Sequence, residues 1–249
     1  MTRPIRLSIN VNKVATLRNA RGGSVPDVVA ASRACITAGA TGITVHPRAD
    51  GRHIRYEDVH ALKQEFANQW GESLEFNIEG DPRDEWLDLV CAVRPQQATL
   101  VPVRAGEITS EAGWNPDTDG AVVERCVRRV RDAGVRASVF VDPTEHAVRF
   151  AKRCGADRIE LYTEPFAKAQ AAGVAPGLAS FETYASAARL AHELGLGINA
   201  GHDLDLTNLP VFATLPHLDE VSIGHAIWSD ALFRGLPAVL RDYLRLLQR

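Results

Sequence analysis

The sequence has 249 residues, of which 45% are hydrophobic and 24% are charged, with a formal net charge of -3 at pH 7. This composition is typical of a soluble globular domain with one large core, and it gives no reason to expect nucleic acid or an anionic membrane as a partner. No apolar stretch reaches the roughly 18 residues that span a bilayer, and the N-terminus lacks the apolar region of a signal peptide, so we expect a cytoplasmic protein.

Eight short apolar runs of strand length recur along the chain, and segments with apolar residues at helical spacing separate them. The runs are residues 5–11, 42–46, 73–79, 98–103, 136–142, 158–163, 197–202 and 220–225. Glycines precede several of them, which is typical of the point where a helix ends and the next strand begins. The alternation predicts one α/β domain over residues 1–249, a (β/α)8 TIM barrel. A doubly wound open sheet is the alternative.

Three segments that follow strands are unusual for a barrel. Residues 12–23 carry Lys13, Arg18 and Arg21 and end in paired glycines, so they predict a basic loop behind the first strand. Residues 104–120 and 164–177 are longer than such connections usually are. We expect both to be loops on the same face, either lids over a site or tolerated surface insertions.

Polar side chains collect where the predicted strands end, and in a barrel these ends meet at one mouth. Besides the basic segment, the candidates are Asn10, Asn12, His46, Arg48, Arg52, His53, Glu75, Asn77, Glu79, Glu160, Thr163, Asn199, His202 and His225. Histidine titrates near neutral pH, and burial can raise the pKa of a glutamate toward the same range. The cluster therefore predicts acid–base catalysis, and Glu75 stands out because it interrupts an apolar strand.

Two anion sites are also indicated. The segments after the seventh and eighth strands, 199–208 and 223–233, lead toward helices, whose first amides bind phosphate in many barrels. Arg48, Arg52 and His53 form a cationic group behind the second strand. Asp203 and Asp205 are poorly placed for the first of these sites, because carboxylates repel phosphate.

Other functions have weaker support. The chain has no G-x-G-x-x-G or P-loop sequence. A zinc hydrolase would need His46, Glu75, His202 and His225 to surround the metal, and a Schiff-base aldolase would need Lys13 as its nucleophile. A purely binding role would leave the polar mouth unexplained. The four cysteines, Cys35, Cys91, Cys126 and Cys154, form no metal-binding spacing and are expected to be reduced packing residues.

Seven segments, in this order, resemble the pyridoxine 5'-phosphate synthase family over essentially the whole chain: "NVNKVATLRNARGG", "GITVHPRADGRHI", "LEFNIEG", "LVPVRAGEITSEAG", "RIELYT", "NAGHDL" and "IGHAI". The resemblance implies a barrel enzyme of vitamin B6 biosynthesis that condenses 3-amino-2-oxopropyl phosphate with 1-deoxy-D-xylulose 5-phosphate and releases phosphate and water. It also implies that no metal or organic cofactor is used, and that homo-octamers assemble through extra helices on the barrel.

The resemblance further implies roles for single residues. His46 and Glu75 match proton acceptors, His202 a proton donor and Glu160 a stabiliser of the transition state. The positions that bind substrate are Asn10, Asn12, Lys13, Arg21, Arg48, His53, Thr109, Asp203, Gly224 and His225. Many members have Asp-His where this chain has Asn12-Lys13, and Gly where it has Asp203. We expect Arg21 to touch ligand and Arg18 only to brace its segment.

Overall fold

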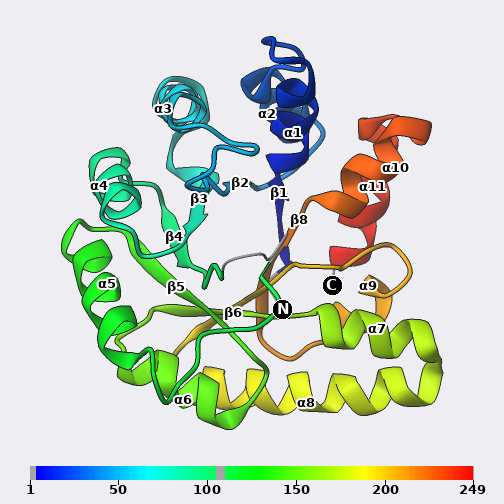
Figure 1. Cartoon of the computed structure of the whole chain (residues 1–249). Coiled ribbons are helices and arrows are strands. Elements are labelled where there is room, and N and C mark those ends of the chain that lie inside the picture. Colours follow the sequence, from blue (N-terminus) through cyan, green and yellow to red (C-terminus); the bar gives the residue numbers. More distant parts are fainter. Residues whose placement is uncertain (1–3, 105–109, 249) are drawn as a thin grey trace.

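The computed structural model describes residues 4–104 and 110–248. Eight parallel strands pair in chain order, and β8 pairs with β1, so the sheet closes into a barrel. Helices surround it on the outside (Figure 1). The predicted (β/α)8 barrel is confirmed, and the open sheet is excluded.

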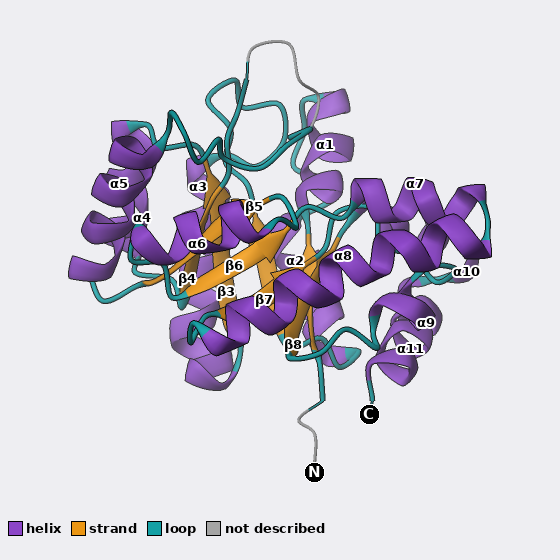
Figure 2. Ribbon diagram, turned by 90° about the horizontal axis from the view of Figure 1, so that it is seen from below, coloured by secondary structure: helices purple, strands orange, loops and turns teal. Residues whose placement is uncertain are grey.

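All eight predicted strands are present, with bounds that differ from the predicted ones by three residues at most. They are β1 Arg6–Asn10, β2 Gly42–Val45, β3 Glu75–Gly80, β4 Gln97–Leu100, β5 Arg136–Val141, β6 Arg158–Leu161, β7 Gly197–Ala200 and β8 Leu218–Ile223. Figure 2 shows that loops gather at one end of the barrel, the mouth, whereas both chain termini emerge at the other end, the base.

The helices bury an apolar stripe against the strands, as Val123, Cys126, Val127 and Val130 do in α5. Their bounds are α1 Asn12–Arg21, α2 Val28–Thr37, α3 Tyr56–Glu65, α4 Asp84–Val93, α5 Gly120–Asp132, α6 Glu145–Arg153, α7 Glu164–Ala172, α8 Val174–Glu193, α9 Leu209–Phe212, α10 His225–Arg234 and α11 Leu236–Leu247. A π-helix, Phe66–Trp70, and a short 3-10 helix, Gly71–Ser73, follow α3.

Two of the predicted loops are helices. Residues 12–21 form α1, whose buried face of Val14, Ala15 and Arg18 was hidden among polar residues in the sequence. Arg18 donates to both carboxylate oxygens of Asp58 in α3, so it braces α1 as predicted. Residues 164–177 form α7 and the first turn of α8, because alanines favour helix and Phe166 buries its ring against Tyr184 and Phe212.

The third long connection, 104–120, lies partly outside the described residues, so its expected action as a lid is not tested. Its later part folds onto the ends of β4 and β5. Ser110 donates to the carbonyl of Pro102, and the Gly113 amide donates to Asp142. The Trp114 indole donates to the carbonyl of Leu100 at 2.9 Å.

The inside of the barrel is polar at mid-height. Ser8 and Thr44 share a hydrogen bond of 2.8 Å, and Thr99 donates to Asn77 at 3.1 Å. All four side chains are buried. The apolar core therefore lies between the strands and the helices, where Cys35, Cys126 and Cys154 also pack. Cys91 is half-buried, and all four cysteines are free thiols. Among the described helices, none is both long and apolar enough to cross a membrane.

Candidate active site

Two histidine–glutamate pairs lie at the mouth. His46 follows the last residue of β2, and its Nδ1 is 3.6 Å from Oε2 of Glu79 on β3. His202 follows β7, and its Nδ1 is 3.8 Å from Oε1 of Glu160 on β6. Each pair joins two neighbouring strands, because β2 pairs with β3 and β6 with β7.

Burial dominates the electrostatics of the first pair. It raises the pKa of Glu79 well above its usual value, and the charge of Glu160 adds to that shift. Burial also lowers the pKa of His46 well below its usual value, helped by the nearby His53 and Arg48. Both residues therefore favour their neutral forms. In the described part of the chain, Nε2 of His46 is buried and has no hydrogen-bond partner.

The second pair is more open on its histidine side. The His202 side chain is 30% exposed, whereas Glu160 is 1% exposed. Burial raises the pKa of Glu160 to about 7, although a hydrogen bond with Thr99 opposes the shift. Burial lowers the pKa of His202, and the charge of Asp203 opposes that change. Groups that titrate near neutral pH suit general acid–base catalysis, because proton transfer to and from them needs little driving force.

The two pairs form one cluster. The charge of His202 contributes to the lowered pKa of His46, and the charge of Glu160 contributes to the raised pKa of Glu79. The structure therefore brings together three of the four residues that the resemblance marks as catalytic.

Glu75 is the exception, and the expectation that it shares the mouth is wrong. It begins β3 at the base, about 13 Å along the strand from Glu79 at roughly 3.3 Å per residue. There it forms ion pairs with Arg6 at 3.0 Å and with Arg136. The sequence placed both glutamates on one face of the strand, but only the strand end meets the mouth. In the sequence, Glu79 is the last residue of the predicted strand 73–79, and this position at the C-terminal end could have selected it over Glu75.

A cationic group lies beside the first pair. Burial lowers the pKa of His53 to about 4, and the charges of Arg48, Arg52 and Lys13 contribute to this shift. The rings of His46 and His53 are 6.1 Å apart. Asn12 accepts a hydrogen bond of 2.9 Å from the His46 amide through its side chain. The cationic group that was predicted behind β2 therefore lies beside the segment that follows β1. Its member Arg52 is exposed, however, and is paired with Asp50.

A second group forms where β1 meets β8. Gly224 lies so close to Asn10 that an added Cβ would be 2.9 Å from the Asn10 Cβ. His225 is the first residue of α10, so the amides at this helix start are available to an anion. Trp228 of α10 donates to the carbonyl of Asn10 at 2.9 Å.

The remaining predicted contacts differ in outcome. Asp203 has a φ of 62°, a left-handed conformation that suits the Gly of many family members and that Asp tolerates. Asn208 holds its carbonyl at 2.9 Å. Arg21 is exposed at the last residue of α1, and no contact in the described part of the chain joins it to either group. Thr109 lies outside the described residues.

The residues that a zinc hydrolase or a Schiff-base aldolase would need are not arranged for either function. Glu75 lies at the base, so the metal set of His46, Glu75, His202 and His225 is not assembled. Within 4–104 and 110–248, no three His, Cys, Asp or Glu side chains are grouped to hold a metal. Lys13 is exposed on a helix rather than placed on a barrel strand, as a Schiff-base aldolase would need.

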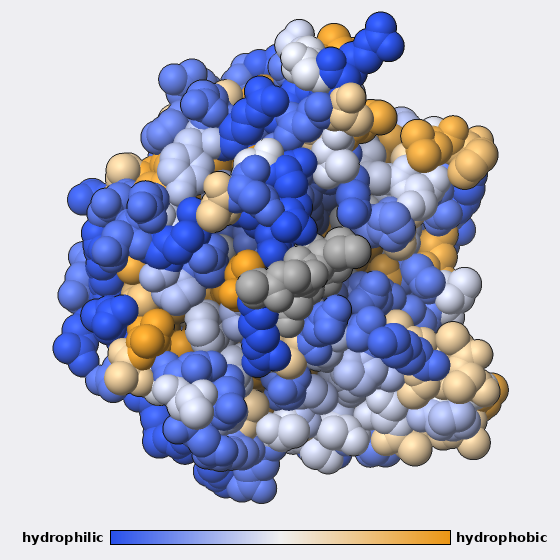
Figure 3. All heavy atoms as spheres, in the orientation of Figure 1, coloured by the Kyte–Doolittle hydropathy of each residue, from blue (hydrophilic) through white to orange (hydrophobic). Residues whose placement is uncertain are grey.

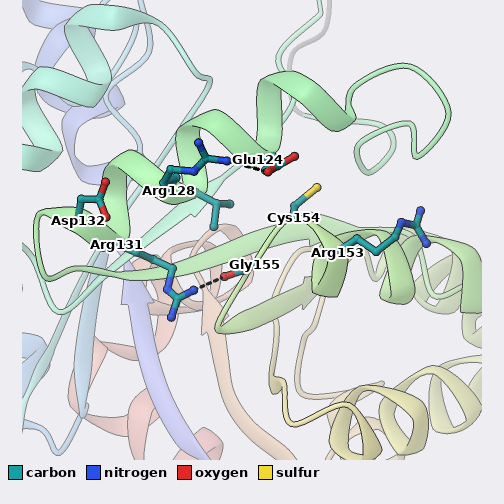
Figure 4. A pocket seen from close by; sticks show the side chains of 8 residues that line it. Glu124, Arg128, Arg131, Asp132, Arg153, Cys154 and Gly155 are labelled. Atoms are coloured by element: carbon teal, nitrogen blue, oxygen red, sulfur yellow. Dashed lines mark hydrogen bonds and ion pairs between the residues drawn. The ribbon is translucent and has the colours of Figure 1, made fainter.

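A hollow of about 470 Å³ lies outside the barrel, between α5 and α6 (Figure 4). Two of its three arginines contact the protein itself: Arg128 donates to Glu124 at 2.8 Å, and Arg131 donates to the carbonyl of Gly155 at 3.0 Å. It is separate from the mouth and contains neither histidine–glutamate pair.

Comparison with known proteins gives a consistent result. The family model described as "Pyridoxal phosphate biosynthesis protein PdxJ" matches residues 7–249. A pyridoxine 5'-phosphate synthase of Christiangramia forsetii is 48% identical over 248 residues, covering 98% of this chain and 99% of the relative. One of Bacteroides fragilis is 49% identical over 239 residues, covering 96% and 97%.

Solved structures share the fold at low identity. A ligand-free tryptophan synthase from M. tuberculosis superimposes with a TM-score of 0.62 at 12% identity, covering 98% of this chain and 93% of that one. A phosphoribosyl anthranilate isomerase from Thermus thermophilus gives 0.57 at 14% identity, covering 98% of both chains. At these identities the likeness concerns the barrel alone.

Proposed function

The chain belongs to the PdxJ family of pyridoxal phosphate biosynthesis proteins, and from this membership we infer that it catalyses the synthesis of pyridoxine 5'-phosphate. In this reaction 3-amino-2-oxopropyl phosphate condenses with 1-deoxy-D-xylulose 5-phosphate, the pyridine ring closes, and phosphate and water are released. The observation in the structure that best supports this function is the pair of histidine–glutamate contacts at the mouth.

The chemistry requires proton transfer at nearly every step. The amine must lose protons as it forms an imine with a ketone, the departing hydroxyl groups must gain them, and enolisation removes one from carbon. We assign the neutral imidazole of His46 as proton acceptor, and we assign Glu79, in place of Glu75, as the protonated carboxyl group beside it. His202 is the more exposed member of the second pair and serves as donor, with Glu160 behind it.

The two polar groups beside the pairs fit two phosphorylated substrates. Lys13, Arg48 and His53 lie on the β2 side and are assigned to the sugar phosphate. Asn10, Gly224 and His225 lie on the β8 side, next to a helix start, and are assigned to the amino-ketone phosphate together with Asp203 and its main-chain amide. The Lys13 ammonium replaces the histidine of many members as a charged donor.

The assignment is tested by supplying both phosphates and following pyridoxine 5'-phosphate by absorbance and mass, with each substrate omitted in turn. We expect product and inorganic phosphate only when both are present. Dialysis against a chelator is expected to leave the rate unchanged. If the folded chain makes no product from the two substrates, the inferred activity is wrong; a rate restored only by a divalent metal would revive a metal-dependent mechanism.

We also propose that the chain forms a homo-oligomer, in line with the octamer that the resemblance implies. Apolar residues lie on the surface at the end of α10, where Leu232 is 76% and Phe233 is 91% exposed (Figure 3). A face of this kind is costly to leave in water, and a second copy would cover it. Light scattering after gel filtration measures the assembly. A monomer at micromolar concentration would contradict the proposal, and Phe233→Glu is expected to shift the mass downward.

A further inference from the structure

Each residue of the two mouth pairs is held by a polar side chain that belongs to neither pair. The His46 amide donates to Asn12, and the Glu160 carboxyl interacts with Thr99. The other two residues are held through their main-chain carbonyls. Trp86 donates to the carbonyl of Glu79, and Thr163 donates to the carbonyl of His202. The function inferred above assigns no role to Trp86 or Thr163.

The contact of Trp86 with the end of β3 is unusually close. Trp86 lies in α4, is fully buried, and places its Nε1 2.9 Å from the carbonyl oxygen of Glu79. The next residue is Gly80, and an added Cβ there would lie 2.1 Å from the same Nε1. The indole therefore reaches the carbonyl only because position 80 has no side chain. Two features of the sequence, one on the strand and one on the helix, produce this single hydrogen bond.

Thr163 performs the corresponding task for the second pair. It follows β6, is fully buried, and its hydroxyl crosses to the connection after β7, where it donates to the carbonyl of His202. The buried Phe140 ring contacts the imidazole edge-on, with 5.4 Å between ring centroids. The main chain and the ring of His202 are thus held from two different strands. A residue in a loop needs such support to keep a fixed geometry.

We propose that Trp86 and Thr163 are positioning residues, which fix Glu79 and His202 against their partners by holding the main-chain carbonyls of these two residues. The inference rests on the proposed function. Histidine–glutamate separations of 3.6 and 3.8 Å leave little room for displacement, and a shift of about 1 Å in a reacting group can cost about a hundredfold in rate. Neither residue exchanges a proton with a substrate.

The first test uses Thr163, for which matched substitutions exist. Thr163→Val keeps the volume and removes the hydroxyl, whereas Thr163→Ser keeps the hydroxyl and removes a methyl group. We expect Thr163→Val to lower kcat by about tenfold with KM within about twofold, and to move the limb of the kcat–pH profile that belongs to the His202–Glu160 pair. Thr163→Ser is expected to stay within about threefold of wild type, with the wild-type profile.

The second test removes the other donor. Trp86→Phe should lower kcat by about tenfold at nearly constant KM, and Gly80→Ala should do the same, because a new Cβ displaces the indole. Trp70→Phe, in the π-helix outside the barrel, is the control for losing an indole and should leave kcat unchanged. Thermal unfolding of every variant separates a loss of folded protein from a loss of rate. Should Trp86→Phe not fold, the Thr163 series decides.

Two outcomes would contradict the positioning role of Trp86 and Thr163. Wild-type kcat and pH profiles in both Thr163→Val and Trp86→Phe, whatever their Tm, would show that the two donors serve stability alone. Equal impairment of Thr163→Ser and Thr163→Val would show that the hydroxyl is not the relevant group. In either case an active wild-type enzyme would leave the proposed function intact, whereas an inactive wild type would remove the premise itself.

Discussion

The two ends of the barrel interior both bury glutamates, but they give them opposite partners. At the mouth, Glu79 and Glu160 face imidazoles. At the base, Arg6 contacts Glu75 at 3.0 Å and Glu220 at 3.3 Å. An imidazole gains and loses its proton near neutral pH, whereas a guanidinium keeps its charge throughout. The mouth therefore pairs its glutamates with groups that exchange protons, whereas the base pairs them with arginines, whose charge is fixed.

Glu75 and Glu79 make this comparison within one strand. They lie on the same face of β3, and both are almost fully buried. The residue type and the strand face are thus the same, and only the neighbours differ. What a buried carboxylate does in this fold depends on which end of its strand it occupies.

The largest expected effect separates these two residues. Glu79→Gln keeps the shape and removes the titrating group, so we expect turnover to fall by at least about a hundredfold, the scale of a lost general acid or base. Glu75→Gln should leave kcat within about threefold, because its partners are arginines at the base. Steady-state rates with both substrates measure the contrast. The opposite order of the two variants would return the catalytic role to Glu75.

His202→Asn tests the second pair of the mouth. Asparagine keeps a polar side chain of similar reach but cannot take or give a proton near pH 7, so turnover should fall by about a hundredfold with a smaller change in KM. His192→Asn, in the last turn of α8, changes the same residue type outside the mouth and should leave the rate unchanged. Unchanged turnover in His202→Asn would exclude it as the proton donor.

The free energy of unfolding should respond in the reverse order, with a larger loss in Glu75→Gln than in Glu79→Gln. Glu75→Gln removes the carboxylate that Arg6 and Arg136 share, and we expect a loss of about 2 kcal/mol in the free energy of unfolding. The figure is below that for a fully buried pair, because about a third of each arginine side chain is exposed and water replaces part of the contact. Urea denaturation monitored by circular dichroism measures it. A stability equal to that of wild type would show that the base network contributes nothing.

A further expected effect concerns the dependence of stability on pH. Burial, and then the charge of Glu75, raise the pKa of Glu220 to about 8, whereas an unfolded glutamate titrates near about 4.3. Between these values the folded chain binds the extra proton, so this carboxyl makes the free energy of unfolding fall as pH rises from about 5 to about 8. Glu220→Gln should flatten part of that fall. Denaturation midpoints at several pH values report the slope, and identical slopes in the two proteins would contradict the assignment.

The eight strands could be predicted from the sequence, because an apolar run and the glycine that precedes it depend only on neighbouring residues in the chain. It missed α1 and α7, since their buried faces are narrow and lie among charged or small residues. It also placed His46, Glu160 and His202 at one mouth from chain order alone. The choice between Glu75 and Glu79 needed the partners that each meets in space, and these come from strands and loops far away in the chain.

The contact between Trp86 and Gly80 couples two positions that evolution can exchange only together. A relative that keeps tryptophan in α4 must keep glycine at the end of β3, because any side chain there would displace the indole. A relative with a smaller residue in α4 loses the donor but gains room for a side chain after Glu79. Members of the family should therefore fall into two groups at these positions, and a single exchange from one group to the other should be worse than both exchanges together.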